Sequence, residues 1–189
     1  MISSILLAAG QSKRMLGENK LIKEFRGMPL INHSINNILY SDIDELIIVL
    51  GFQSEIVKKL IKKNDKIKFI FNKDFEAGMS SSIKVGINGL SNKSEAFFIS
   101  LADMPMVNKN IYNKLIISKT DKEIIVPTYK GQQGNPILFS ISMKKKIMNI
   151  SGDVGAKNIL KLCKSKILNV ETNDESITKG FNTPKSFNN

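Results

Sequence analysis

Two basic side chains and one carboxylate occupy positions in this sequence from which they could handle phosphate groups. Arg14 and Lys20 lie on the loop that follows a short apolar run, residues 2–8. Asp103 ends a second apolar run, residues 96–103. Cations with free backbone N–H groups bind polyphosphate, and a carboxylate next to phosphate oxygens suits Mg²⁺. The pattern predicts that a nucleoside triphosphate and a divalent cation bind where the two runs end.

The loop after residues 2–8 begins with small residues. Ala8, Ala9 and Gly10 let the backbone approach a ligand closely, and Ser12 adds a hydroxyl beside the cations. The loop matches neither the G-x-G-x-x-G dinucleotide fingerprint nor the P-loop, in which Lys and then Ser or Thr follow the last glycine. An ordinary turn between a strand and a helix, with exposed lysines, is the alternative to a phosphate loop.

Two further features could complete the site. Pro105 stops the strand that ends at Asp103 and fixes the turn, so the carboxylate would lie at the edge of a sheet. Gly78 precedes the serines of residues 80–82 at a predicted helix start, where N–H groups and hydroxyls are free for a base, ribose or phosphate. Each feature has a structural alternative: a turn or capping aspartate for the first, and a serine cap for the second.

Strands and helices alternate through the first half of the sequence. Continuous apolar runs predict strands buried on both faces at residues 2–8, 45–51, 66–72 and 96–103. Helical patterns lie between them, at residues 29–39, 53–63 and 80–90. This alternation predicts βαβ units and a parallel sheet. Ligands bind beyond the carboxyl ends of such strands, which favours the loops 8–20, 51–54, 72–80 and 103–107 as the site.

The second half of the sequence has a different pattern. It predicts a helix near 108–118, strands near 123–129 and 135–140, short helices near 142–149 and 153–162, and a late strand at 166–171. These strands would extend the sheet as a mixed portion. Because no repeat, low-complexity segment or linker divides the chain, we expect a single domain, residues 1–189.

Composition narrows the possible partners. The chain of 189 residues has a net charge of +11 and is 42% hydrophobic, enough for one core. Only Arg14 and Arg26 are arginines among 28 basic residues, and nucleic-acid readers favour arginine, so we expect no nucleic-acid partner. No apolar run reaches the roughly 20 residues of a membrane span and no signal-peptide pattern is seen, so we expect a cytoplasmic protein that binds no membrane. The single cysteine, Cys163, agrees with a reducing compartment, and both Cys163 and His33 are expected to be structural.

Taken together, these segments resemble the family of MobA-like nucleotidyltransferases, most closely its molybdenum cofactor cytidylyltransferase branch. The resemblance covers nearly the whole chain, in order: LLAAGQSKRM with Lys20 after it, RGMPLI, VLGF, NKDFEAGMSSSI, LADMP, GQQGNPILF, GDVGAK and FNTPKSF. It implies an α/β protein with a Rossmann-like nucleotidyltransferase fold, in which a mostly parallel sheet carries helices on both faces.

The resemblance also implies roles for individual residues. Arg14, Lys20 and Asp103 would be catalytic, with Arg14 at the triphosphate, Lys20 near the α-phosphate and Asp103 on Mg²⁺. The nucleotide would bind to the first half, residues 1–105, through Leu7, Ala8, Ala9, Gly10, Ser12, Arg14, Lys20, Gly51, Asn72, Gly78, Ser80 and Ser81. The second substrate, a pterin phosphate, would bind to the second half, residues 106–189, at segments 131–136 and 152–157, through Gly134, Asn135, Pro136, Gly152 and Asp153.

The same resemblance favours CTP as the nucleotide. Leu7-Ala8-Ala9-Gly10 is similar to the cytidylyl branch, and the methyl group of Ala9 would leave less room for a purine. Asn182, where that branch usually has aspartate, resembles the guanylyl branch, and its amide oxygen could also serve the metal. The implied reaction is transfer of CMP from CTP to molybdopterin, with release of pyrophosphate.

Three alternatives stay open at this point. The first is a GTP-dependent guanylyltransferase acting on molybdopterin. The second is a nucleotidyltransferase acting on another sugar or alcohol phosphate. The third is a noncatalytic carrier that delivers finished cofactor to a molybdenum hydroxylase apoprotein, which would also be the recipient of an enzyme's product.

Overall fold

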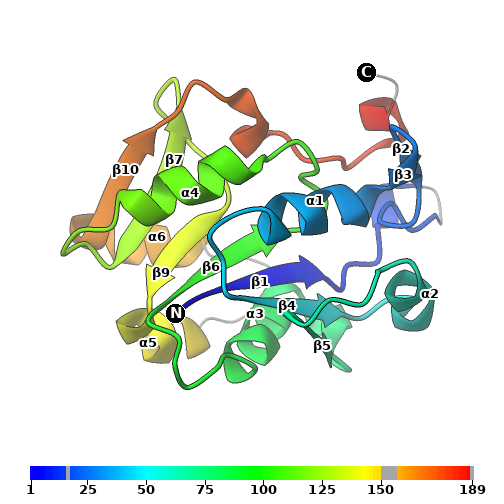
Figure 1. The fold of residues 1–189 in the computed structure, drawn as a ribbon, viewed down its shortest axis with the longest axis horizontal. Coiled ribbons are helices and arrows are strands. Elements are labelled where there is room, and N and C mark those ends of the chain that lie inside the picture. Colours follow the sequence, from blue (N-terminus) through cyan, green and yellow to red (C-terminus); the bar gives the residue numbers. More distant parts are fainter. Residues whose placement is uncertain (16–17, 150–156, 188–189) are drawn as a thin grey trace.

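The chain forms a mixed, mostly parallel sheet covered by helices on both faces (Figure 1). The computed structural model describes residues 1–15, 18–149 and 157–187. Within these ranges one sheet has eight strands in the order β10-β7-β9-β6-β1-β4-β5, with β8 paired to β7. Their bounds are β1 (Ile2–Ala8), β4 (Glu45–Leu50), β5 (Ile67–Phe71), β6 (Ala96–Leu101), β7 (Ile124–Tyr129), β8 (Gln132–Gln133), β9 (Ile137–Ser140) and β10 (Ile167–Glu171).

The order of the parallel strands creates a switch point beside β1. From β1 the chain moves outward to β4 and then β5, and it returns to the other side of β1 to form β6. Both neighbours of β1 run parallel to it, as Leu7 opposite Val49 and Leu7 opposite Leu101 illustrate. Open α/β sheets bind ligands where the strand order reverses, beyond the carboxyl ends of the strands. The loops after β1 and β6 meet at that position.

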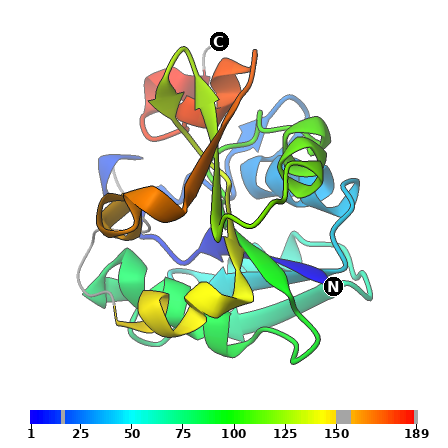
Figure 2. The same ribbon diagram turned by 90° about the vertical axis from the view of Figure 1, so that its left-hand side faces the viewer.

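Helices form a layer on each side of the sheet (Figure 2). The core has two clusters because alternate residues of a strand face opposite sides. Leu6 belongs to the cluster that contains residues of α1 (Leu30–Leu39), α2 (Ser54–Lys59) and α4 (Lys109–Ile117). Its neighbour Ile5 belongs to the cluster that contains residues of α3 (Met79–Asn88), α5 (Lys144–Met148) and α6 (Lys157–Leu162). This arrangement confirms the predicted α/β fold class.

Short elements connect and decorate the sheet. A two-stranded hairpin, β2 (Glu24–Phe25) and β3 (Met28–Pro29), turns at Arg26 and Gly27, both of which have positive φ angles. Sequence reasoning did not predict this hairpin. Single 3₁₀ turns are η1 (Lys13–Met15), η2 (Phe75–Ala77), η3 (Ile141–Met143), η4 (Lys164–Lys166), η5 (Glu175–Thr178) and η6 (Pro184–Phe187).

Several helices and strands are shorter than the sequence predicts. The helix expected at 53–63 is α2, which ends at Lys59, because the exposed polar residues 62–65 offer nothing to bury. The strand expected at 135–140 begins only at Ile137, after Pro136, whose nitrogen cannot donate to a neighbouring strand. The helix expected at 142–149 is split into η3 and α5. Of the helix expected at 153–162, residues 153–156 lie outside the described residues.

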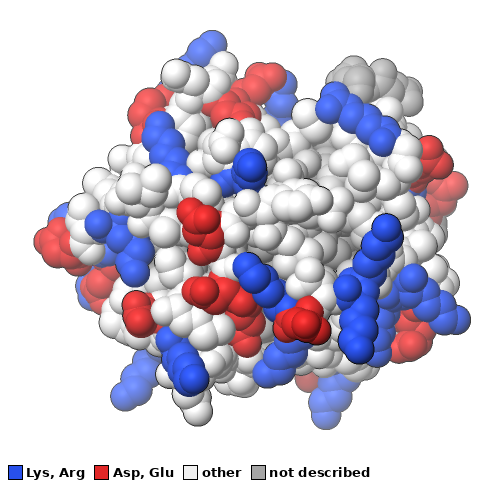
Figure 3. Space-filling model, viewed as in Figure 1, with Lys and Arg blue, Asp and Glu red and all other residues white. Residues whose placement is uncertain are grey.

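Charge is spread over the face seen in Figure 3, where Lys and Arg side chains are interspersed with Asp and Glu. Cys163 is buried in the second core cluster. His33 packs edge-on against Phe25, and one of its ring nitrogens lies 2.6 Å from the carbonyl oxygen of that residue. Among the described residues, no helix is both long enough and apolar enough to cross a bilayer.

Candidate nucleotide-binding site

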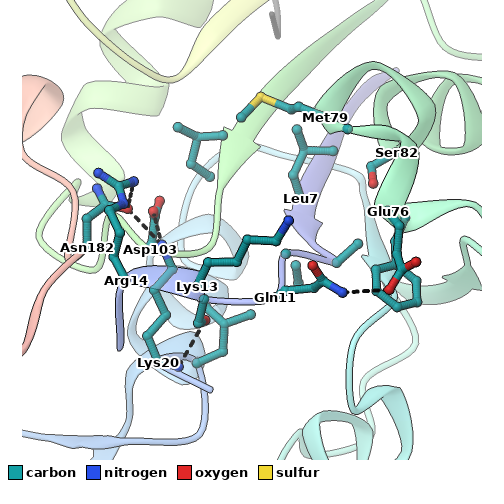
Figure 4. Close-up of a pocket in the computed structure, with 18 residues that line it drawn as sticks. Leu7, Gln11, Lys13, Arg14, Lys20, Glu76, Met79, Ser82, Asp103 and Asn182 are labelled. Carbon is teal, nitrogen blue, oxygen red and sulfur yellow. Dashed lines mark hydrogen bonds and ion pairs between the residues drawn. The ribbon is translucent and has the colours of Figure 1, made fainter. Parts of the chain in front are cut away.

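A cavity of about 370 Å³ opens at the switch point of the sheet. Its wall comes from the end of β1 and the following loop, residues 7–14, together with Lys20, Leu101, Asp103 and Asn182. The turn η2 and the start of α3 close the opposite side (Figure 4). The cavity therefore has a charged end, near Asp103, and a less polar end, near Leu7 and Met79. A nucleotide has the same asymmetry, with a charged phosphate chain and a flat base.

Four side chains converge at the charged end of the cavity. Lys20 Nζ donates to Asp103 Oδ2 at 2.5 Å and to Asn182 Oδ1 at 2.9 Å. Arg14 donates from its guanidinium to the same Asn182 oxygen at 3.1 Å. The Lys20 and Asp103 side chains are 15% and 18% exposed, so this ion pair is only partly screened by water. Residues far apart in the sequence thus form one polar cluster.

Backbone contacts hold Asp103 and Asn182 in place. The N–H of Phe181 donates to the carbonyl oxygen of Asp103 at 2.7 Å, which fixes the chain next to Asn182. A Cβ atom on Gly180 would lie 2.9 Å from Asn182 Nδ2, so glycine leaves room for the amide to turn toward Lys20. On the other side, the hydroxyl of Ser34 on α1 donates to the Ala102 carbonyl at 3.1 Å.

Two local features position Arg14 and Lys20 on the first loop: the buried side chain of Met15 and a turn that begins at Ser12. Met15 is 1% exposed, and its N–H donates to the Ser12 carbonyl at 2.8 Å, which forms the turn that carries Arg14. The Ser12 hydroxyl accepts the backbone N–H of Lys20 at 3.1 Å. Ser12 lines the cavity and also joins the two ends of the loop. Its backbone has a φ of 54°, an uncommon conformation for a residue other than glycine.

Gly51 lies behind the small-residue segment rather than on the cavity wall. A Cβ atom there would come within 2.7 Å of Phe75 Cβ and 2.8 Å of Ala9 Cβ. Phe52 N–H donates to the Ala9 carbonyl at 3.2 Å, which ties the ends of β4 and β1 together. Glycine at position 51 therefore allows Phe75, which lines the cavity, to pack close to Ala9.

The predicted residues around α3 occupy two layers. Gly78 lines the cavity together with Ser82, whereas Asn72, Ser80 and Ser81 do not reach its wall. The Asn72 amide donates to the hydroxyls of Ser81 and Ser82, each at 2.9 Å, and Asn72 is only 1% exposed. This buried amide fixes the start of α3. Of the three serines predicted to offer hydroxyls to a ligand, Ser82 is the one that lines the cavity.

The predicted acceptor residues lie at the same edge of the sheet. Ile137 pairs with Ile99 in the antiparallel register of β9 and β6, so Asn135 and Pro136 lie beside the carboxyl end of β6. Asn135 N–H donates to the Ile177 carbonyl at 2.8 Å, and Gly134 N–H donates to the Pro127 carbonyl at 2.9 Å. Gly152 and Asp153 lie outside the described residues.

The structure adds Gln11 and Glu76, to which the sequence assigns no role. The Gln11 amide donates to Glu76 Oε1 at 2.7 Å, and this bond joins the first loop to η2. Lys13 extends over the cavity in Figure 4. Lys13 belongs to the run of cations on the first loop that the sequence predicts to suit a polyphosphate, and it does line the cavity. The position of Glu76 in the sequence does not indicate a role. Glu76 follows β5 and Gln11 follows β1, so their contact depends on the order of these strands in the sheet.

The oxygen atoms at the charged end suit a hard divalent cation. Asp103 and Asn182 already direct one carboxylate oxygen and one amide oxygen at a single positive group, Lys20 Nζ. Among the described residues, no three His, Cys, Asp or Glu side chains gather to bind a metal by themselves. Mg²⁺ and similar ions are often held by one or two protein oxygens with phosphate oxygens and water. The residues present fit an ion that is shared with a bound phosphate chain.

Comparison with known sequences identifies the family. The profile of the MobA-like NTP transferase domain matches residues 4–170. The chain belongs to this family. The family predicted from the sequence is therefore confirmed, and the cavity just described is the candidate active site of a MobA-like nucleotidyltransferase.

Two relatives give the MobA-like chain its context. Nicotine blue oxidoreductase of Paenarthrobacter nicotinovorans is 24% identical over 96% of this chain and 92% of its own length. A probable molybdenum cofactor guanylyltransferase of Methanosarcina acetivorans is 27% identical over 78% of this chain. The match covers 66% of that guanylyltransferase's length.

Solved structures share the MobA-like fold over almost the whole chain. The crystal structure of Rv0371c from Mycobacterium tuberculosis H37Rv superimposes with a TM-score of 0.88, at 20% identity, over 99% of this chain and 95% of that one. A complex of Rv0371c with manganese has a TM-score of 0.71 at 22% identity, over 90% of this chain and 89% of that one. At these identities the likeness concerns the fold.

Proposed function

We propose that this nucleotidyltransferase is a molybdenum cofactor cytidylyltransferase, which transfers CMP from CTP to molybdopterin and releases pyrophosphate. The observation that carries the proposal is the convergence of Arg14, Lys20 and Asp103 at one end of a cavity whose wall is the Leu7–Gly10 segment. Two cations at that end suit a triphosphate, and the small residues beside it leave space for a base.

The proposed reaction needs positioning and charge neutralisation more than proton transfer. An oxygen of the terminal phosphate of molybdopterin attacks the α-phosphorus of CTP, and the bond from that phosphorus to the bridging β-phosphate oxygen breaks. Lys20 and Arg14 neutralise charge that builds on the leaving pyrophosphate. A phosphate nucleophile is already ionised near neutral pH, so the reaction requires no general base.

Mg²⁺ is the proposed metal, held by Asp103 with the amide oxygen of Asn182. When bound, such an ion supplies positive charge to the phosphate oxygens around the reacting centre. The role of the protein is to hold both oxygens at one point, through the Phe181 hydrogen bond and the open space at Gly180. A solved structure of a similar fold is a complex with manganese, which supports the proposal of a divalent ion.

The choice of CTP rests on the resemblance of Leu7–Gly10 to the cytidylyl branch and on the packing behind that segment. Ala9 is 4% exposed, and a Cβ atom on Gly51 would lie 2.8 Å from the Ala9 Cβ and 2.7 Å from the Phe75 Cβ. The Ala9 methyl group and Phe75 therefore both pack against the space that glycine leaves at position 51. A larger purine base would require this packing to open. GTP is the competing nucleotide, because a relative is named a guanylyltransferase.

Redox chemistry is the second candidate, since the nicotine blue oxidoreductase match covers nearly all of both chains. A redox enzyme built on this cavity would bind a dinucleotide such as a nicotinamide or flavin cofactor, with its pyrophosphate at Arg14 and Lys20. A carrier of finished cofactor, without catalysis, is the third candidate, and a molybdenum hydroxylase apoprotein would be its partner.

The deciding experiment is a set of calorimetric titrations with CTP, GTP, UTP and ATP, each with Mg²⁺, followed by a pyrophosphate-release assay with molybdopterin. We expect selective CTP binding and release of pyrophosphate that depends on both substrates. Selective GTP binding would assign the chain to the guanylyl branch. Parallel titrations with a reduced nicotinamide and a flavin dinucleotide test the redox candidate, which binding of either one without any triphosphate would favour. Binding of molybdopterin without turnover would favour the carrier.

A further inference from the structure

Lys20 occupies the position in the site where a divalent cation would need to bind. Its Nζ lies 2.5 Å from Asp103 Oδ2 and 2.9 Å from Asn182 Oδ1, the two oxygens that fit a metal (Figure 4). The ammonium group thus satisfies both oxygens. Lys20 therefore differs from a lysine that contacts only a phosphate chain, because it contacts the oxygens that would bind the metal.

An ammonium group in this position competes with a metal ion for these two oxygens. Mg²⁺ takes oxygen ligands at about 2.0–2.1 Å, so a bound ion would lie almost in contact with Nζ at its present position. The positive charges would then repel each other in a site where both side chains are less than one-fifth exposed. Arg14 adds a second positive charge on the Asn182 oxygen. Two cations therefore face one carboxylate in this cluster.

We propose that Lys20 is an internal cation that keeps divalent metal out of the site until a nucleoside triphosphate binds. The inference rests on the proposed nucleotidyltransferase function and deepens it by assigning the order in which the ligands bind. The triphosphate draws the Lys20 ammonium away from Asp103, and the freed carboxylate then receives the metal. Metal and nucleotide therefore bind as a pair rather than independently.

The local structure allows this exchange. The backbone of Lys20 is held by Ser12, whereas its ammonium group is carried on a flexible four-carbon chain. Phosphate oxygens form strong charge-assisted hydrogen bonds with lysine, so they can replace the Asp103 and Asn182 contacts. If Lys20 opposes metal binding and the nucleotide removes this opposition, then the nucleotide raises the affinity for metal. Because binding linkage is reciprocal, the metal raises the affinity for nucleotide by the same factor.

The test is a titration with Mn²⁺ alone, followed by electron paramagnetic resonance of the free ion and by calorimetry. We expect the wild-type protein to bind Mn²⁺ weakly, and Lys20→Met to bind it roughly tenfold more tightly or better. Lys23→Met is the matched control, because Lys23 pairs with Glu18, 3.1 Å away, and not with Asp103. The control should bind Mn²⁺ as the wild-type protein does.

Two further variants make the result specific. Lys20→Gln keeps a hydrogen-bond donor beside Asp103 without the charge, and it should also tighten Mn²⁺ binding if Lys20→Met folds poorly. Lys20→Met combined with Asp103→Asn should lose the gain, which places the extra Mn²⁺ on Asp103. In the presence of a nonreactive α,β-methylene analogue of CTP, the wild-type protein should bind Mn²⁺ tightly.

The inference is overturned by either of two results. One is tight Mn²⁺ binding by the wild-type protein without nucleotide. The other is Mn²⁺ affinity in folded Lys20→Met and Lys20→Gln that equals or falls below that of the wild-type protein. The titrations with Mn²⁺ alone contain neither CTP nor molybdopterin, so a failure of the proposed reaction does not affect how they are read.

Discussion

The backbone N–H of Phe181 donates a 2.7 Å hydrogen bond to the carbonyl oxygen of Asp103. This bond joins a late segment of the chain to the end of β6. The Phe181 ring packs between two others, with ring centroids 4.8 Å from Phe25 and 5.3 Å from Phe187. Asn182 follows directly and contacts Lys20. An aromatic cluster on the surface of the sheet thus determines where a polar group of the site lies.

Replacement of Phe181 by alanine should loosen the site and destabilise the fold together. The ring is 8% exposed, and removal of such a buried ring costs about 3 kcal/mol in the free energy of unfolding. Urea unfolding followed by circular dichroism measures this loss, and calorimetry should show weaker nucleotide binding. Phe71→Ala, which removes a ring that is 56% exposed, is the control and should have a small effect on both. Equal losses in the two variants would contradict the anchoring role of Phe181.

Asp103→Asn should abolish most of the turnover while it leaves the fold intact. The amide cannot supply the negative charge expected at the metal, and we expect turnover to fall roughly 10²–10³-fold, as for loss of one strong electrostatic contact at a reacting centre. Pyrophosphate release measures the rate, and thermal unfolding checks the fold. Asp65→Asn, on an exposed loop away from the cavity, is the control. Turnover like that of the wild-type protein in Asp103→Asn would remove Asp103 from the proposed metal site.

Ala9→Gly should relax the selection against GTP. Removal of the methyl group that packs near Gly51 would give the cavity wall room to move back. One such group changes discrimination by about tenfold or somewhat more. The ratio of CTP to GTP affinity, measured by calorimetry, is the readout. Ala96→Gly, at the far end of β6, controls for a general loss of stability. An unchanged ratio in Ala9→Gly would show that another part of the cavity selects the base.

Glu171 should make the hairpin of β7 and β8 sensitive to acid. The pKa of its carboxyl group is lowered, first because the Thr128 hydroxyl donates to it at 2.6 Å, and also because the Lys130 N–H donates at 2.9 Å. A lowered folded-state pKa stabilises the fold above the unfolded value, about 4.3 for glutamate, and this contribution is lost as the pH falls through the folded-state pKa. Glu171→Gln should therefore be less stable than the wild-type protein at neutral pH.

The difference in stability between wild-type protein and Glu171→Gln should shrink as the pH is lowered from about 6 to about 3. Urea midpoints across this range provide the measurement. Glu55→Gln, on the exposed side of α2, is the control and should run parallel to the wild-type protein. A constant gap between wild-type protein and Glu171→Gln across the range would show that the contacts of the carboxylate do not depend on its charge.

The sheet could be predicted from the sequence where strands are buried on both faces. Every residue from Leu46 to Leu50 is buried, so β4 appears as an unbroken apolar run. Asp103 could be placed near Arg14 and Lys20 because the carboxyl ends of parallel strands share one edge. This rule applies to parallel strands, and β9 is antiparallel to β6. The loop before β9 could therefore be placed at the same edge only from the observed register of β9 with β6.

Contacts that depend on long-range pairing could not be predicted. Glu76 reaches Gln11 because η2 folds over the end of β1, and neither residue has a periodic signal. The buried amide of Asn72 supports the start of α3, although its sequence context looks like that of a ligand-binding loop. Local patterns predict helices and strands, whereas which polar groups are left for a ligand depends on the complete set of hydrogen bonds.

The pairing of β9 with β6 has a consequence for work with fragments of this protein. Phe97, Phe98 and Ile99 pair with β9, which comes from the other half of the chain. A fragment that ends near residue 105 would expose this central strand as an open apolar edge, and such edges promote aggregation. The two halves of the chain are therefore expected to be insoluble when produced separately, and co-expressed halves should regain solubility only by associating along β6 and β9.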